Sequence, residues 1–344
     1  MRVAQILLAL VVATASTGVL GIKETTAIAV SAKKKVKVKK VKKAKTKPTP
    51  SGPLARELFA AATAPTPMPA RAIGFYAKGC LAGGVALPID GPAWQVMRLS
   101  RNRNWGHPDL IALVERLAVD AKEHDGWPGL LVGDIAQPRG GPMRSDHASH
   151  QVGLDADIWL TPMPDRRLSE REREDLRAIS MVAADRISVD PNVWSDAQVR
   201  LLKRAASYAE VERIFVNPAI KKALCDAVPK DADRAWLHKV RAYWGHESHF
   251  HLRIGCPKDS AGCISQPALP NDDDGCGQEL SNWLAMVKKP PKPEPPTAPT
   301  AAAPSRRGIT LDQLPADCRA VLDWGGADKP ASASAPTATT TAGK

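Results

Sequence analysis

The sequence predicts an α+β fold, in one globular domain between roughly residues 71 and 288 of the 344. Apolar residues recur with a helical period after Pro108. Short apolar or alternating runs are typical of strands, and long loops rich in Gly and Pro separate them. We therefore expect a small antiparallel sheet that carries the functional site, with helices around it, long loops and three disulfides.

The first long helix is expected to begin at Pro108. Proline suits the first helical position because its missing N–H would have no partner there. Capping boxes mark two further helix starts, Ser169 with Glu172 and Ser195 with Gln198. The apolar positions of the first helix follow a period of about 3.6 residues: Leu110, Leu113, Val114, Leu117 and Ala121.

Strands are expected at residues 130–135, 154–160 and 250–254. Alternation along the second of these places Asp155 and Asp157 on the face opposite to its apolar residues. A carboxylate on a buried strand is costly unless it is paired or bound to a metal. This strand is therefore a candidate to carry part of a site.

The chain ends read as non-globular segments. Residues 1–29 resemble a secretory signal, with Arg2, an apolar run and a small-residue cleavage site at residues 27–29; an uncleaved anchor is the alternative. We expect residues 30–70 to be a Lys-rich and then Pro-rich disordered linker. A second Pro-rich linker is expected at residues 289–308, followed by a short segment with Cys318 at 309–324 and a disordered tail at 325–344.

The net charge of +12 is concentrated in one segment, since ten lysines lie between Lys33 and Lys47 and the rest of the chain carries only +2. This distribution argues against a folded nucleic-acid-binding surface. An anionic wall polymer or a membrane surface is a plausible partner for the segment, and a charged spacer without a specific partner is the alternative.

Six cysteines in an exported chain indicate three disulfides. Spacing alone leaves their pairing open. No Cys-x-x-Cys pair is present, which argues against a zinc ribbon. The cysteines are Cys80, Cys225, Cys256, Cys263, Cys276 and Cys318.

Five of the eight histidines fall in two short segments, residues 147–157 and 246–251. Zinc takes three or four imidazole or carboxylate ligands, and a catalytic site leaves one position for water. On a strand, His249 and His251 share one face and Phe250 points to the other. The two segments together predict a zinc site. The other histidines, His107, His124 and His238, are interpreted as structural or exposed.

Four strings, at residues 106–110, 147–157, 213–221 and 245–253, resemble the penicillin-insensitive murein endopeptidases, which group with the D-Ala-D-Ala metallopeptidases and lysostaphin-type enzymes. The likeness covers about residues 74–324. It implies one catalytic zinc held by His150, Asp157 and His251, with His147 as a further histidine beside the metal.

The resemblance also implies roles for two more histidines. Ser248 stands where related peptidases have a carboxylate base, so His246 is expected as the general base and His249 as the group that stabilises the oxyanion, and the two roles could be exchanged. A second metal site of some relatives matches residues 185–188, which lack the required histidine. The implied disulfides are Cys80–Cys318, Cys225–Cys276 and Cys256–Cys263.

The function implied by the resemblance is a periplasmic zinc endopeptidase. It would cleave the cross-link between D-alanine and meso-diaminopimelate in peptidoglycan and would be insensitive to penicillin. Two alternatives remain at this stage. One is a D-Ala-D-Ala carboxypeptidase acting on stem peptides; the other is a non-catalytic wall-binding protein that works through its Lys-rich segment.

Overall fold

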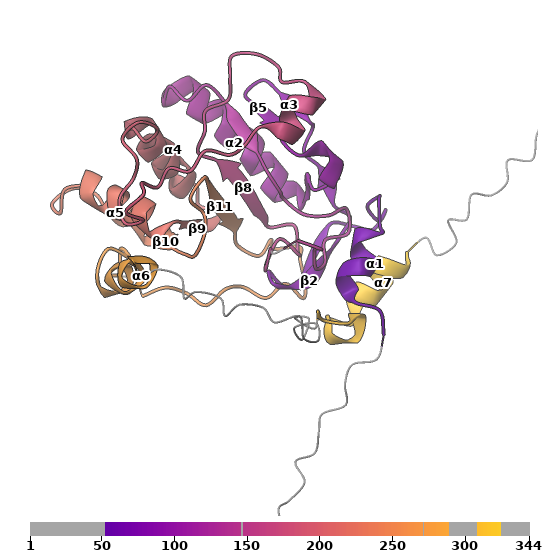
Figure 1. The fold of residues 1–344 in the computed structure, drawn as a ribbon. Helices are drawn as coiled ribbons and strands as arrows, with labels where there is room; N and C mark the ends of the chain where they lie inside the picture. Colours follow the sequence, from indigo (N-terminus) through magenta and orange to yellow (C-terminus); the bar gives the residue numbers. More distant parts are fainter. Residues whose placement is uncertain (1–51, 146, 271, 289–307, 325–344) are drawn as a thin grey trace, which may run out of the picture. The chain divides into compact units, whose positions relative to one another are not determined.

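The computed structural model describes residues 52–145, 147–270, 272–288 and 308–324 (Figure 1). The expected signal peptide, the Lys-rich segment, the second Pro-rich linker up to residue 307 and the C-terminal tail lie outside these residues. Among the described helices, none combines the length and the apolar character that crossing a membrane requires.

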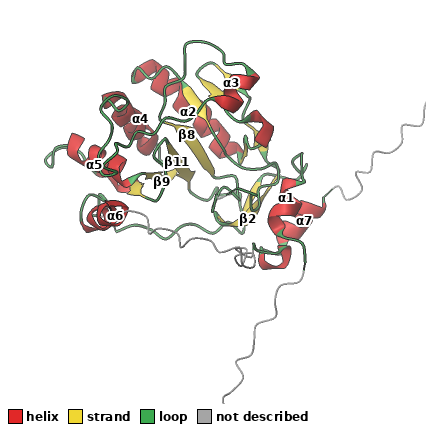
Figure 2. Ribbon diagram, in the orientation of Figure 1, coloured by secondary structure: helices red, strands yellow, loops and turns green. Residues whose placement is uncertain are grey.

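A seven-stranded sheet forms the centre of the fold, in the order β10-β9-β11-β8-β7-β5-β4 (Figure 2). Strand β11 lies between β8 and β9 and pairs antiparallel with both, whereas β9–β10 and β5–β7 are parallel pairs. The strands are β4 (Asp90–Gly91), β5 (Trp94–Val96), β7 (Leu130–Val132), β8 (Asp155–Trp159), β9 (Val211–Val216), β10 (Val240–Ala242) and β11 (His249–Ile254).

The α+β prediction is confirmed, and the three expected strands correspond to β7, β8 and β11. The sheet is larger than expected and is mixed instead of purely antiparallel. The reason is that β4, β5 and β10 have only two or three residues each, too few for an alternating pattern to be recognised, and that the six residues of β9 do not alternate in burial.

Helices cover one face of this sheet. The core combines α2, α4 and α5 with the apolar residues of β8, β9 and β11, including Ile158, Ile214 and Phe250. Both expected capping boxes are present, at the starts of α3 and α4. The helical elements here are η1 (Leu99–Arg101), α2 (Pro108–His124), α3 (Glu170–Asp175), α4 (Asp196–Ser207), α5 (Pro218–Ala227), η2 (Ala235–Lys239) and α6 (Gln278–Lys288).

A second, smaller core joins the two ends of the described chain. There α1 (Ala55–Ala60) and α7 (Asp317–Asp323) lie side by side next to the hairpin of β1 (Arg71–Phe75) and β2 (Lys78–Ala82) (Figure 1). Two further elements are η3 (Leu311–Gln313) and the short pair β3 (Val85–Ala86) with β6 (Trp105–Gly106).

The expectation of a disordered linker up to residue 70 is wrong for α1. Ala55 and Phe59, one helical turn apart, are fully buried against Cys80 and Val321. The prolines that suggested a linker lie on either side of this helix, and a stretch without proline separates them. Burial of Phe59 therefore orders a segment that composition alone assigns to a linker.

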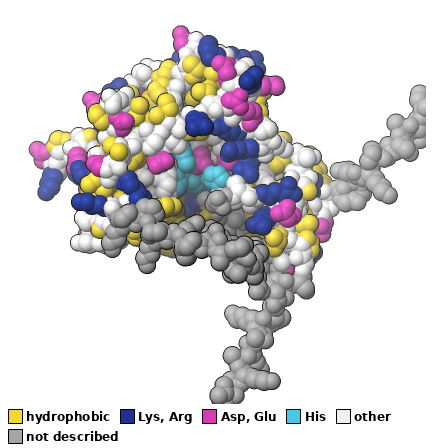
Figure 3. All heavy atoms as spheres, in the orientation of Figure 1, with side chains coloured by type: hydrophobic (Ala, Val, Ile, Leu, Met, Phe, Trp, Pro, Cys, Tyr) yellow, Lys and Arg dark blue, Asp and Glu magenta, His cyan; other side chains and the backbone are white. Residues whose placement is uncertain are grey.

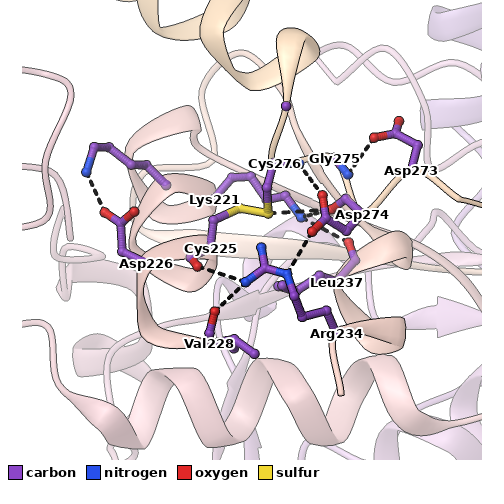
Figure 4. The surroundings of a disulfide bond; sticks show 12 residues. Lys221, Cys225, Asp226, Val228, Arg234, Leu237, Asp273, Asp274, Gly275 and Cys276 are labelled. Atoms are coloured by element: carbon purple, nitrogen blue, oxygen red, sulfur yellow. Dashed lines mark hydrogen bonds and ion pairs between the residues drawn. A yellow bond between two sulfur atoms is a disulfide. The ribbon is translucent and has the colours of Figure 1, made fainter. Parts of the chain in front are cut away.

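Three disulfides are present, Cys80–Cys318, Cys225–Cys276 and Cys256–Cys263, and they are the pairs implied by the resemblance. The second joins α5 to the segment before α6 (Figure 4). Beside it, the buried Lys221 donates hydrogen bonds to the carbonyl oxygens of Leu237, at 2.9 Å, and Asp274, at 2.6 Å. Burial lowers the pKa of Lys221 to about 7.

Candidate metal centre

The polar face of β8 and β11 carries the candidate site. In their antiparallel register His249 lies opposite Trp159, His251 opposite Asp157, and Arg253 opposite Asp155. Side chains two residues apart on a strand share a face, so these six line one side of the sheet and leave the apolar residues to the core. Figure 3 shows histidine side chains gathered in the middle of the visible face, next to a group of Lys and Arg side chains.

The loop before β8 supplies His147 and His150. The backbone of His150 has φ 65° and that of Gly153 has φ 71°, both in the left-handed region. A Cβ at Gly153 would lie 3.0 Å from the backbone nitrogen of His107 and 2.7 Å from the side chain of Leu81, which together with the positive φ favours glycine here. The amide of His150 donates to Asp155 Oδ2 at 3.0 Å, which fixes the loop to the strand that it precedes.

The potential ligand atoms converge on Asp157. One ligand atom from each of His147, His150 and Asp157 lies within 4.8 Å of the other two. His150 Nε2 is 3.3 Å from Asp157 Oδ1, and His147 Nδ1 is 3.8 Å from Oδ2. His251 approaches from β11, with Nδ1 3.3 Å from Asp157 Oδ1. The structure thus brings together all four residues that the sequence suggested as ligands.

Buried atoms without a hydrogen bond indicate that a metal fits this cluster. His150 Nδ1 lies 2.7 Å from the carbonyl oxygen of Ile135, which can only accept a hydrogen bond, so Nδ1 is protonated and Nε2 faces Asp157. His150 Nε2 and Asp157 Oδ1 are buried, and neither forms a hydrogen bond within the described part of the chain. Buried polar atoms are nearly always paired. Imidazole and carboxylate donors of this kind are ligands for zinc and similar divalent metals.

Charges in the cluster compensate one another. Burial raises the pKa of Asp157, but His150 and His249 outweigh this effect and hold the pKa well below its ordinary value. Burial lowers the pKa of His150, yet the carboxylates of Asp157 and Asp155 raise it to about 9. A metal ion bound here would compete with protonation of His150, because ligands bind in their deprotonated form.

Asp155 contacts the candidate ligand His251 on the side away from Asp157. It accepts from Arg253 Nε at 2.7 Å and lies 2.9 Å from His251 Nε2. Burial raises the pKa of Asp155, but Arg253 and His251 keep it well below the ordinary range. A carboxylate beside Nε2 favours a proton on that nitrogen, so Nδ1 of His251 offers its lone pair toward Asp157.

Asp134 supports His147 in the same way. It lies after β7, accepts from Arg103 at 2.7 Å and from Arg101 at 3.1 Å, and is 3.1 Å from His147 Nε2. Burial raises the pKa of Asp134, but the contacts with His147, Arg103 and Arg101 lower it to about 2. The charged carboxylate favours a proton on Nε2 of His147 and leaves Nδ1 toward Asp157.

His246 and His249 lie beside the cluster and next to each other, and each lines a different pocket. The ring of His246 is 5.1 Å from that of His249 and 5.8 Å from that of His251. His246 Nδ1 is 2.8 Å from the carbonyl oxygen of Trp244, so its other nitrogen is unprotonated in the neutral ring. Burial and the neighbours His251 and His249 lower the pKa of His246 to about 3. His249 Nε2 lies 3.7 Å from Asp157 Oδ1.

Two pockets meet at the cluster. The pocket of about 460 Å³ contains His246, and its walls are largely aromatic, with Phe75, Phe215, Tyr243 and Trp244. The pocket of about 190 Å³ contains His249, Trp159 and two arginines, Arg98 and Arg101. A substrate that crosses the cluster would therefore meet an aromatic surface on one side and a basic surface on the other.

The remaining histidines have structural contacts. His107 is buried and caps α2, accepting from the amide of Asp109. His238 Nδ1 lies 3.0 Å from the carbonyl oxygen of Asp273, and His124 ends α2. Asp185 accepts hydrogen bonds from Ser188 in a local turn, so its carboxylate is engaged within the segment 185–188.

Sequence reasoning missed three residues of the site. Arg253 could have been found, because it follows His249 and His251 at the same two-residue spacing on one strand face. Asp134 and Arg101 follow short elements and meet only in the folded chain, so no local pattern marks them.

The family and the curated proteins that this chain matches carry the same name. The family described as penicillin-insensitive murein endopeptidase matches residues 72–323. Curated proteins with the same name are similar. The one from Yersinia enterocolitica is 44% identical over 74% of this chain and 86% of its own length. The one from Haemophilus influenzae is 47% identical over 64% and 74%, and the one from Salmonella heidelberg 41% identical over 76% and 89%.

Proposed function

This chain belongs to the penicillin-insensitive murein endopeptidase family, and we propose on that basis that it is a zinc peptidase that hydrolyses peptide cross-links in peptidoglycan. The bond we assign is the one between D-alanine and meso-diaminopimelate of the neighbouring stem peptide. The observation that carries the proposal is the convergence of His147, His150 and His251 on the buried Asp157.

We assign the metal to His150, Asp157 and His251, with His147 as an additional donor. The support is the pair of unsatisfied atoms on His150 and Asp157 and the carboxylates that orient the other two histidines. Zinc held there would supply a Lewis acid for the scissile carbonyl and for the attacking water.

His246 is the proposed general base. It lies in the aromatic pocket, and hydrogen bonding of Nδ1 to the carbonyl of Trp244 leaves Nε2 to take the proton from water as the scissile carbon is attacked. Its lowered pKa keeps the ring neutral at neutral pH.

His249 is proposed to stabilise negative charge on the carbonyl oxygen. It lies next to Asp157, with Nε2 3.7 Å from Oδ1. A donor placed where charge develops acts strongly in a site from which water is excluded. Because His246 activates water and no side chain is acylated, a β-lactam has no acceptor to modify and should not inhibit the enzyme.

Peptidoglycan lies outside the cytoplasm, so the proposed function places the protein in an extracytoplasmic compartment. Its three disulfides are consistent with an oxidising environment. We propose that this compartment is the periplasm, reached through a signal peptide at residues 1–29. We further propose that the lysines between Lys33 and Lys47 contact an anionic wall or membrane surface.

The test is zinc content and cross-link cleavage measured on the same preparation, with and without a chelator. We expect roughly one zinc per chain, and conversion of muropeptide dimers to monomers that stops with chelator, returns with zinc and is unaffected by penicillin. Release of only the terminal D-alanine from monomers would instead identify a carboxypeptidase. Binding to sacculi without cleavage would identify a wall-binding protein, and absence of zinc would refute the ligand assignment.

A further inference from the structure

The basic pocket adjoins Asp157 and His249 and is lined by Arg98 and Arg101. Its only carboxylates among the described lining residues are Asp134 and Asp157. Asp157 belongs to the metal cluster, and Asp134 is shared between Arg101, Arg103 and His147. The single carboxylate of Asp134 thus pairs with two arginines, Arg101 and Arg103. Arg98 adds a third positive charge, so positive charge is in excess next to the metal ligands.

Arg101 is the arginine of this pocket with donors to spare. Its Nη1 donates to Asp134 at 3.1 Å, which is the one hydrogen bond of its side chain within the described residues, and this side chain is 44% exposed. A guanidinium carries five N–H donors in a planar fork suited to a carboxylate. Most of those donors face the pocket or solvent.

The other arginines near the cluster are already engaged. Arg98 donates to the backbone carbonyls of Arg173, Glu174 and Leu176. In the aromatic pocket, Arg253 donates to Asp155 and to Gln266. Arg101 is therefore the described arginine best placed to bind a further anion beside the metal centre.

The proposed substrate carries such an anion. In the cross-link, the scissile nitrogen is attached to the carbon of meso-diaminopimelate that also bears a free carboxylate, so a negative charge lies one carbon away from the bond to be cut. We propose, on the basis of the proposed function, that Arg101 binds this carboxylate and thereby selects cross-links with a free acid over cross-links in which that carboxylate is amidated.

This selection also orients the cross-link across the cluster. The diaminopimelate side lies in the basic pocket with Arg101, and the D-alanyl side lies toward the aromatic pocket with His246. The ion pair between Arg101 and this carboxylate forms next to the scissile bond. A small displacement of the substrate at this place would lower the rate most strongly.

The experiment compares two muropeptide dimers that differ only in this group, a free carboxylate or a carboxamide, as substrates of the zinc-loaded full chain. Wild type should have a kcat/KM at least roughly tenfold higher for the free acid, as expected for a charge-assisted pair. Arg101→Gln should lower kcat/KM on the free acid and leave the amidated substrate nearly unchanged, so that the preference disappears. Arg101→Lys, which keeps the charge without the fork, should retain part of the preference.

Arg103→Gln is the matched control, because Arg103 also pairs with Asp134 but does not line the pocket. If arginines near Asp134 act only by holding that carboxylate, both glutamine variants should lose activity equally on the two substrates, and the inference fails. It also fails if wild type cleaves both dimers equally or if Arg101→Gln keeps the preference. These outcomes leave the proposed function intact, whereas cleavage of neither dimer by wild type would refute the function itself.

Discussion

His251 lies directly opposite Asp157 in the antiparallel pairing of β11 with β8. A slip of one residue in this pairing would turn either side chain toward the core, since successive residues of a strand face opposite ways. The core prevents such a slip, because Phe250 and Ile158, the neighbouring cross-strand pair, are fully buried on the other face. Core packing on one face therefore sets the geometry of the metal cluster on the other.

Asp155→Asn should weaken metal binding without removing a ligand. The variant loses the charge that orients His251 and leaves buried Arg253 without its carboxylate. Loss of an orienting carboxylate lowers metal affinity by about 10- to 100-fold, and a broken buried ion pair costs about 3–5 kcal/mol of folding stability. Competition with a zinc chelator and thermal unfolding measure the two effects. Asp175→Asn, in an exposed ion pair, is the control, and equal affinity in both variants would contradict the supporting role.

His246→Ala should abolish most cleavage while zinc stays bound. A general base contributes about 10²- to 10⁴-fold to a rate, and His246 lies outside the proposed ligand set. The measurement is kcat on muropeptide dimers together with zinc content. His124→Ala, at the exposed end of α2, should keep wild-type activity.

The corresponding His249→Ala variant separates the two histidine roles. Loss of an oxyanion donor should lower kcat by about 10²- to 10³-fold, and the fall should persist at higher pH. Loss of a general base should be offset in part as hydroxide concentration rises. If His249→Ala recovers with pH and His246→Ala does not, the two roles are exchanged.

Removal of the disulfide between Cys80 and Cys318, by changing both residues to Ser, should destabilise the small core of α1, α7 and β2. The disulfide closes a loop of 238 residues, and the loss should be about 3–5 kcal/mol at most. Thermal unfolding and proteolysis of α7 report the effect. Zinc content should stay unchanged, because the ligands lie in the main sheet and its adjoining loop; loss of zinc would show that the small core supports the site.

Lys221 should make stability depend on pH above neutrality. Its folded pKa of about 7 lies below the unfolded value of about 10.4, so the unfolded chain binds more protons between these values and stability rises as pH increases. The slope is at most about 1.4 kcal/mol per pH unit. Chemical unfolding between pH 7 and pH 9 measures it. In Lys221→Met the rise should be absent; an unchanged slope would show that another group is responsible.

Much of the site could be predicted from the sequence because strand alternation is a local property. Asp157, His249 and His251 are placed correctly by a two-residue period alone. The loop histidines His147 and His150 were predicted because histidines cluster in this short segment of the sequence, and not from strand geometry.

Features that depend on contacts between distant segments could not be predicted in this way. Arg101 and Asp134 are 33 residues apart and meet only after β5 and β7 pair. Helix α1 has too few residues for a helical period, and its partners Cys80 and Val321 lie far along the chain. The cysteine pairs followed from the resemblance to a family, since spacing leaves every pairing open.

The bond between Cys80 and Cys318 also changes what a cut in the chain would do. A protease that cleaves anywhere between residues 289 and 307 would leave α7 covalently attached to β2. The two fragments would separate in electrophoresis only after reduction. The molecule can thus be nicked in that stretch and still keep its C-terminal helix in place beside the hairpin.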